Sequence, residues 1–256
     1  MKLALVLSGG GAKGAFHLGM LHFFEEENIK IEAYSGTSIG SIIACSHASG
    51  VSAKEQFKIF KSKEIKKALK FNYFKRGLLK IDHNNKIINE LLPVEKLEDL
   101  SQKVYINAYD IIGKRMHYFS QGNIIDLCMA SSALIPIFKP ISYKKMQLID
   151  GGFIDNLAAK PFFNKNFSVF SSNVFPKSEN KKSLYLNPVK YLRKKIFRHV
   201  SKNMITAIEN SDYYFTSLKL NKYKILSFKD IEPCYALGYK EAQNQLKKFL
   251  KDYRDK

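Results

Sequence analysis

Three short segments of the chain carry the residue types that catalysis or cofactor binding requires. Residues 5–19 (LVLSGGGAKGAFHLG) contain the spacing G-x-G-x-x-G between an apolar run and a helix-like run. Residues 36–40 (GTSIG) place Ser38 between two glycines, and residues 149–152 (IDGG) place Asp150 at the end of an apolar run. Together they can support either dinucleotide binding or attack by a serine nucleophile.

The glycine loop by itself allows both interpretations. A dinucleotide-binding turn holds a pyrophosphate at a helix N-terminus and needs an acidic residue at the end of the second strand, about twenty residues further on. Glu32 lies near that distance, but early in the strand expected at 30–35, whose carboxyl end leads into the serine motif. Gly9, Gly10 and Gly11 leave backbone N–H groups uncovered before a helix, as an oxyanion hole requires. We therefore favour a loop that binds a transient oxyanion.

The serine motif has the form of a nucleophile elbow. A serine on a tight turn between a strand and a helix needs a strained backbone, and the residues two positions away must lack side chains. Gly36 and Gly40 meet this need around Ser38, and the N-terminus of the following helix favours negative charge there. By itself the motif is a weak signal, and its position on a predicted strand–turn–helix unit is what strengthens it.

A serine nucleophile needs a base, and the chain offers two candidates. In the order Ser–Asp–His the histidine follows the aspartate, and His199 is the one histidine after Asp150. His199 lies in the run LRKKIFRHV, which is typical of a solvated basic helix face, so direct action by Asp150 is the simpler scheme. We expect His17, His22 and His47 to be packed or on the surface, with pocket lining as the alternative for His17. The alternative for the DGG segment is an ordinary turn.

The sequence resembles the patatin-like phospholipase family in four motifs that occur in the family's order. They are GGGAKG at 9–14, GTSIG at 36–40, ASSALIPIFKP at 130–140 and DGG at 150–152. Two positions depart from the family pattern: Pro136 is displaced by one residue, and Ala158 stands where a proline is often found. Both shape the pocket wall, so they leave the acyl-chain preference open but not the reaction class.

The resemblance implies hydrolysis of lipid acyl esters by a serine–aspartate dyad without a catalytic histidine, a metal ion or an organic cofactor. Ser38 is then the nucleophile, Asp150 the general base, and the N–H groups of Gly9, Gly10 and Gly11 the oxyanion hole. The supporting positions are Gly36, Gly40, Lys13, Gly151, Gly152 and Asn156. Lys13 stands where the family has Arg or Lys, and it either adds positive charge or holds the loop through a contact elsewhere. The alternatives are a dinucleotide-binding protein and a lipid-binding protein without turnover.

The net charge of the chain is strongly positive and unevenly distributed. The formal charge is +19, and residues 161–256 hold 20 basic and 8 acidic residues, or +12. Such a field favours anionic partners. Of the 42 basic residues all but five are Lys, which lacks the planar fork that nucleic-acid recognition favours. We rank a solvated basic surface first and an anionic membrane surface second, and we expect no nucleic-acid partner.

The remaining motifs bear on compartment and membrane contact. The apolar run LALVL is too short for a signal peptide, and no apolar stretch reaches 18 residues, so we expect a cytoplasmic protein without a spanning helix. Residues 57–80 mix aromatic and Lys residues; a packed helix with a solvated Lys face is favoured, and a helix lying on the inner membrane face is the alternative. The three cysteines show no metal-binding spacing, and the oligomeric state is left open.

The hydrophobic pattern predicts strands that alternate with helices. Strands are expected at 2–7, 30–35, 103–109, 115–119, 145–149, 167–175 and 224–228, and helices at 14–27, 39–50, 53–92, 123–133, 188–210 and 236–252. This order predicts a three-layer α/β/α fold with a mainly parallel central sheet. We expect a single domain over 1–256, with the catalytic motifs in 1–160 and a basic part at 161–256.

Overall fold

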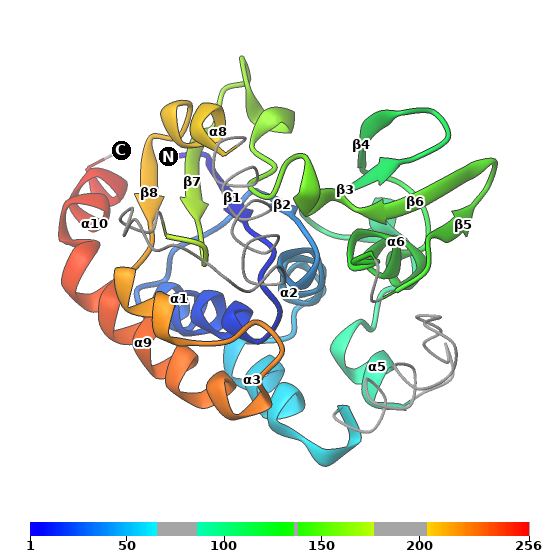
Figure 1. The fold of residues 1–256 in the computed structure, drawn as a ribbon. Coiled ribbons are helices and arrows are strands. Elements are labelled where there is room, and N and C mark those ends of the chain that lie inside the picture. Colours follow the sequence, from blue (N-terminus) through cyan, green and yellow to red (C-terminus); the bar gives the residue numbers. More distant parts are fainter. Residues whose placement is uncertain (66–85, 136–137, 177–203, 256) are drawn as a thin grey trace, which may run out of the picture.

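A sheet of eight strands forms the centre of the structure, a computed structural model that describes residues 1–65, 86–135, 138–176 and 204–255. The strands are β1 Leu3–Leu7, β2 Ala33–Gly36, β3 Lys103–Asp110, β4 Arg115–Phe119, β5 Ile141–Tyr143, β6 Met146–Asp150, β7 Ser168–Ser172 and β8 Tyr213–Phe215. Their order across the sheet is β5-β6-β3-β2-β1-β7-β8, and β4 pairs with β3 outside this row (Figure 1). The first strand of the chain therefore lies inside the sheet, between β2 and β7.

The strands around β1 are parallel, and those beyond β3 are antiparallel. β1 runs parallel to β2 and β7, β2 to β3, and β7 to β8, whereas β6 runs antiparallel to β3 and β5. The expected mainly parallel sheet is confirmed. Because parallel strands end at the same edge, the loops after β1, β2 and β7 meet there. β6 reaches this region from the opposite direction, and its last residue, Asp150, pairs with Ala108 of β3.

Helices and loops cover both faces of the sheet. The helices are α1 Ala15–Glu26, α2 Ile39–Ala48, α3 Ala53–Lys61, α5 Lys86–Leu91, α6 Ile124–Ser131, α8 Ile205–Glu209, α9 Ile231–Gln245 and α10 Lys247–Arg254. Side chains of β1 alternate between the faces, so Leu3, Leu5 and Leu7 enter a large core with α1, α2, α6 and α9. Ala4 and Val6 enter a smaller core on the other face, with α8.

The helix that follows the glycine loop packs along the C-terminal helix α9. A side-chain carbon added at Gly19 of α1 would lie 2.1 Å from the carbonyl oxygen of Tyr235, and one added at Gly238 of α9 would lie 2.1 Å from that of Phe16. Only glycine permits backbones to approach so closely. The C-terminal part of the chain thus packs directly against the helix that begins at the glycine loop.

The strand expected at 224–228 is wrong. Residues 224–227 lie between two turns of 3-10 helix, η5 Leu218–Lys222 and η6 Phe228–Asp230, and Phe228 begins the second. The carbonyl oxygen of Ile225 accepts a hydrogen bond from the N–H of Ala12 at 2.7 Å, so this backbone contacts the glycine loop and not a neighbouring strand.

Other element boundaries differ in smaller ways. β2 begins at Ala33 and not at residue 30, and the short strand β8 was not expected. The helix predicted at 236–252 is two helices, α9 and α10, which meet at Leu246. Of the helix predicted at 188–210, only α8 lies within the described residues.

The basic segment 57–80 lies mostly outside the described residues. Its beginning belongs to α3, which starts with a capping box between Ser52 and Glu55 and ends at Lys61, because the backbone of Ser62 is extended. Within the residues that the structure describes, none of the helices combines the length and the apolar character that crossing a bilayer requires.

Candidate active site

Ser38 lies on a sharp turn between β2 and α2. Its backbone has φ 52° and ψ −123°, a conformation that residues with a side chain rarely adopt. A side-chain carbon at Gly36 would lie 2.5 Å from the backbone of Gly40, and one at Gly40 would lie 2.3 Å from the carbonyl oxygen of Leu7. Glycine is therefore required on both sides of Ser38, and the turn has the geometry of a nucleophile elbow.

The backbone of this turn is held by Ser131, the last residue of α6. The N–H of Ser38 donates to Ser131 Oγ at 2.8 Å, and Ser41 Oγ donates to the carbonyl oxygen of Ser38 at 2.6 Å. Ser131 lies in the segment ASSALIPIFKP, but the sequence pattern predicts no role for it. The contact spans 93 positions, and no local pattern could have found it.

Asp150 lies beside Ser38 at the end of β6 and is almost completely buried. Its Oδ1 accepts a hydrogen bond from the N–H of Gly152 at 2.7 Å, and the Ser38 side chain also donates to the carboxyl group. Burial raises the pKa of Asp150 to about 7, because desolvation outweighs these two hydrogen bonds. A buried carboxyl group with this pKa can exchange a proton with Ser38 near neutral pH.

The glycine loop lies against the elbow. A side-chain carbon added at Gly9 would lie 3.2 Å from Cβ of Ser38 and 2.7 Å from Oδ1 of Asn156. In the part of the chain that the structure describes, the N–H groups of Gly9, Gly10 and Gly11 have no hydrogen-bond acceptor. Since backbone N–H groups are seldom left unpaired in a folded protein, these three are available to a ligand.

A buried histidine fixes the start of this loop. His17 Nε2 donates to the carbonyl oxygen of Ser8 at 3.0 Å, and Nδ1 accepts from Ser172 Oγ at 2.8 Å. Burial lowers the pKa of His17 to about 4, so the ring is neutral at pH 7. Ser8 Oγ also accepts from the N–H of Val174 at 3.0 Å. His17 is thus a packed residue, as expected.

Asn156 lies between the glycine loop and the DGG turn. It is buried, and its Nδ2 approaches the carbonyl oxygen of Gly9 at 3.5 Å. A side-chain carbon at Gly152 would lie 2.7 Å from its Oδ1 and 2.9 Å from Oδ1 of Asp150. The predicted residues Gly9, Ser38, Asp150, Gly152 and Asn156 are therefore brought together by the fold.

Two residues that the sequence did not single out hold the DGG turn through Asp155. Tyr118 on β4 donates its hydroxyl to Asp155 Oδ2 at 2.6 Å, and Asn107 on β3 donates to the carbonyl oxygen of Asp155 at 2.6 Å. The amide of Asn107 also lies against Gly151, where a side-chain carbon would come within 2.7 Å of it. These contacts fix the backbone that follows Asp150.

The contacts of Lys13 are with residues other than Ser38 and Asp150, the two predicted catalytic residues. It is buried, its Nζ lies 5.4 Å from the ring centre of Phe175, and Asp230 is a nearby charge. Desolvation lowers the pKa of its ammonium group. Of the two interpretations of Lys13, these contacts support the one in which it holds the loop through residues elsewhere.

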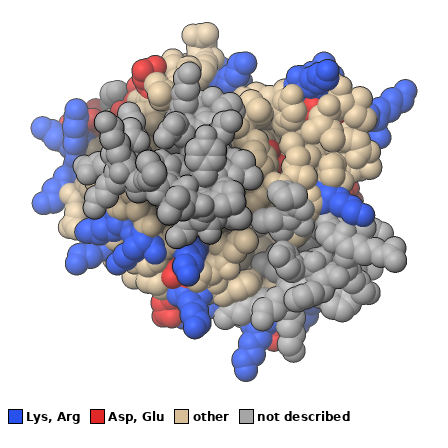
Figure 2. All heavy atoms as spheres, viewed as in Figure 1, with Lys and Arg blue, Asp and Glu red and all other residues tan. Residues whose placement is uncertain are grey.

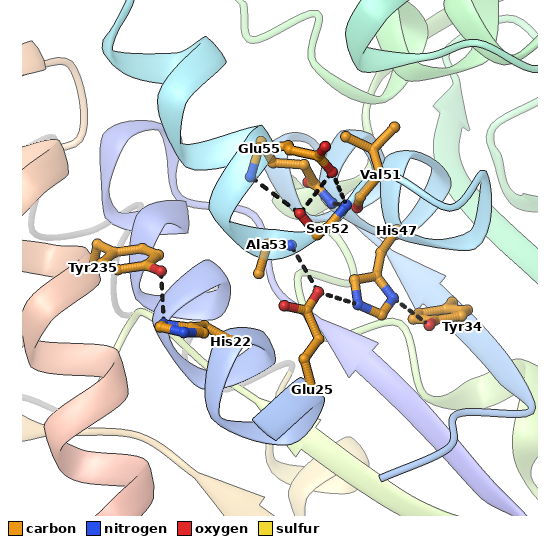
Figure 3. Close-up of polar contacts among 10 residues, drawn as sticks. His22, Glu25, Tyr34, His47, Val51, Ser52, Ala53, Glu55 and Tyr235 are labelled. Atoms are coloured by element: carbon orange, nitrogen blue, oxygen red, sulfur yellow. Dashed lines mark hydrogen bonds and ion pairs between the residues drawn. The ribbon is translucent and has the colours of Figure 1, made fainter. Parts of the chain in front are cut away.

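The histidines of α1 and α2 are paired with other side chains at a distance from Ser38. His47 lies near the end of α2, about 13 Å along the helix from Ser38, with Nε2 at 3.1 Å from Glu25 Oε1 and Nδ1 at 2.7 Å from the Tyr34 hydroxyl (Figure 3). His22 Nδ1 contacts the Tyr235 hydroxyl at 2.8 Å (Figure 3). Among the described residues no histidine contacts Ser38 or Asp150; His199 and Pro136 lie outside them.

Glu32, the candidate for gripping a ribose, lies at the wrong end of its strand. It precedes β2 and is exposed, whereas the glycine loop and Ser38 follow the carboxyl ends of β1 and β2. A dinucleotide on the glycine loop would need this acid at the opposite end.

Comparison with known proteins identifies a family for this chain. The family model for patatin-like phospholipase matches residues 5–163. Lysophospholipase NTE1 of Coccidioides immitis is 32% identical over 171 residues, which cover 60% of this chain and 10% of that protein. Patatin-like phospholipase domain-containing protein 6 of Mus musculus is 31% identical over 166 residues, covering 61% of this chain and 12% of that protein.

A solved structure is similar over a longer part of the chain. The crystal structure of VipD from Legionella pneumophila has a TM-score of 0.54 and 14% sequence identity, covering 98% of this chain and 67% of that one. At this identity the likeness bears on the fold alone. The chain spans about a tenth of the length of the two curated relatives, so the similarity to them concerns one segment of much longer proteins.

Proposed function

The chain belongs to the patatin-like phospholipase family, and from this premise we propose that it hydrolyses lipid acyl esters through Ser38 and Asp150. One observation carries the proposal: a serine hydroxyl on a strained turn donates to a buried carboxyl group whose pKa is about 7. A base of this pKa takes up a proton efficiently at neutral pH. No metal ion or organic cofactor takes part in the proposed reaction.

The first half of the reaction acylates the serine. Asp150 takes the hydroxyl proton as Ser38 Oγ attacks the ester carbonyl carbon. The negative charge that develops on the carbonyl oxygen is stabilised by the N–H groups of Gly9, Gly10 and Gly11 and by the N-terminus of α2. The tetrahedral intermediate then collapses, and the leaving alcohol takes the proton from Asp150.

The second half releases the acyl chain as a fatty acid. Asp150 takes a proton from a water molecule, and the water oxygen attacks the carbonyl carbon of the acyl-enzyme. Collapse of this second intermediate frees the fatty acid and returns the proton to Ser38 Oγ. Asn156 contacts the glycine loop, and Tyr118 holds the turn after Asp150. In the proposed reaction these contacts keep the positions of Asp150 and the glycine loop fixed relative to each other.

The proposed substrates are lysophospholipids and phospholipids, as the names of the similar proteins suggest. We expect the purified protein to release fatty acid from at least one member of a panel of lysophospholipids, diacyl phospholipids and neutral glycerides. The measurement is free fatty acid by mass spectrometry, with a soluble nitrophenyl ester assayed in parallel. Saturable NAD(P) binding together with no hydrolysis would instead favour the dinucleotide alternative.

Ser131 is expected to position the nucleophile without touching the substrate. Replacing it with alanine removes the acceptor of the Ser38 N–H, so the elbow loses one of its restraints. We expect kcat to fall roughly tenfold with little change in KM. Ser131→Thr keeps the hydroxyl and should restore most of the rate. An alanine variant with unchanged kcat would show that the other restraints suffice.

A further inference from the structure

The segment 218–229, between β8 and α9, presents exposed apolar residues of a kind that the rest of the fold mostly buries. Leu218 and Leu226 are 62% and 67% exposed, although leucine is among the residues most often buried. Both lie on irregular backbone, in or beside the turns η5 and η6. Neither side chain belongs to the hydrophobic cores of the described residues. We call residues 218–229 the docking segment.

The same segment carries unneutralised positive charge. Lys222, Lys224 and Lys229 form no salt bridge within the described part of the chain, whereas Lys219 pairs with Glu241 at 2.8 Å. Basic side chains also dominate the charged surface on the face of the molecule drawn in Figure 2. Exposed leucines flanked by lysines that no salt bridge among the described residues neutralises suit a bilayer with anionic lipids, because its interior accepts the leucines and its headgroups attract the lysines.

The docking segment lies beside the predicted oxyanion loop. The carbonyl oxygen of Ile225 accepts from the N–H of Ala12, and a side-chain carbon added at Gly11 would lie 2.3 Å from that oxygen. Because β8 is parallel to β7, the segment leaves the sheet at the edge where the loop after β1 and the elbow after β2 lie. In Figure 1 it runs from the end of β8 across α1 towards α2.

We propose that the docking segment binds the surface of an anionic bilayer, with Leu218 and Leu226 inserted among the headgroups and Lys222, Lys224 and Lys229 beside lipid phosphates. This inference deepens the proposed function and rests on it, since docking here would bring lipid esters to the glycine loop. It assigns the membrane contact to residues that lie far along the chain from the basic segment 57–80.

The test compares two double variants of the full chain in vesicle co-sedimentation. Leu226→Ser with Lys224→Gln changes the docking segment, and Leu218→Ser with Lys222→Gln repeats the test at its other end. The matched control is Ile112→Ser with Lys114→Gln in the β3–β4 turn, where Ile112 is 65% exposed. Vesicles contain phosphatidylcholine alone or with a third of phosphatidylglycerol, and hydrolysis of a soluble nitrophenyl ester is measured on every protein.

We expect wild type and control to bind the anionic vesicles alike, and each docking-segment variant to bind at least roughly tenfold more weakly. All four proteins should hydrolyse the soluble ester at the same rate. No binding by wild type, unchanged binding by both docking variants, or an equal loss in the control would overturn the proposal. Binding that behaves as expected in a protein without esterase activity would contradict the proposed function but not the docking segment.

Discussion

Replacing Ser38 with alanine is expected to reduce ester hydrolysis at least roughly a thousandfold. The substitution removes the one atom that can form the acyl-enzyme, while the glycine loop and Asp150 remain in place. Removal of a nucleophile leaves only the contribution of binding and of the oxyanion hole, which is small beside covalent catalysis. The same change should abolish labelling by a fluorophosphonate probe, because the probe reacts with an activated serine.

The matched control for this variant is Ser49→Ala, at the other end of α2. Ser49 Oγ donates to the carbonyl oxygen of Cys45 at 2.7 Å and is remote from Asp150, so its loss should leave labelling and turnover intact. Circular dichroism and the unfolding midpoint would establish that both variants are folded. Full esterase activity in Ser38→Ala would refute the assigned nucleophile, and a wild type that binds lipid but reacts with neither probe nor ester would favour the lipid-binding alternative.

Asp150→Asn is expected to lower kcat/KM by a similar factor and to remove its dependence on pH. In the wild type, burial raises the pKa of Asp150 from 3.8 to about 7, and only the carboxylate can take the proton of Ser38. Activity should therefore rise with pH and reach half of its plateau near pH 7. The measurement is kcat/KM on a soluble ester between pH 5 and 9.

The Asp150→Asn variant should be more stable than the wild type, although it is expected to be less active. A folded pKa above the unfolded value means that the native protein disfavours the charged form, so the carboxylate costs no stability below about pH 3.8 and its full cost above about pH 7. The amide carries no charge, so we expect a gain of the order of 1–4 kcal/mol at pH 8 that shrinks towards pH 4. Urea unfolding at both pH values measures it.

Asp155→Asn separates the base from its neighbours. The amide can still accept the Tyr118 hydroxyl, so activity should fall far less than in Asp150→Asn. Equal losses in the two variants would mean that the whole turn, and not the Asp150 carboxyl group, determines the rate.

The elements that hold Ser38 and Asp150 could be predicted because their causes are local. Glycines at two positions from Ser38 are needed by the turn itself, since a side chain at either would meet backbone atoms. The five apolar residues of β1 are followed directly by Ser8 and glycines, and a short apolar run with such a boundary predicts a strand inside a sheet. The carboxylate was recognised because DGG follows an apolar run directly.

The rest depends on contacts between distant parts of the chain. The segment KILSF at 224–228 alternates like a strand, yet the carbonyl oxygen of Ile225 is bound by Ala12 and Leu226 is exposed. An alternating sequence pattern does not show whether a segment pairs with a neighbouring strand or makes a single backbone hydrogen bond of this kind. Ser131 and Tyr118 escaped notice for a similar reason, since each is defined only by a partner that folding brings close.

One of the two strands that pair with β1, β7, lies outside the residues that match the family. The matched residues end at 163, but β7 begins at Ser168. His17 is hydrogen-bonded to Ser172, and Ser8 is hydrogen-bonded to Val174. A fragment cut at the end of the match would contain the proposed nucleophile and base, Ser38 and Asp150, and would still lack the strand β7 beside the glycine loop. The residues that identify the family end before the residues that the fold needs. The strand that supports the glycine loop lies in the part of the chain outside the family match.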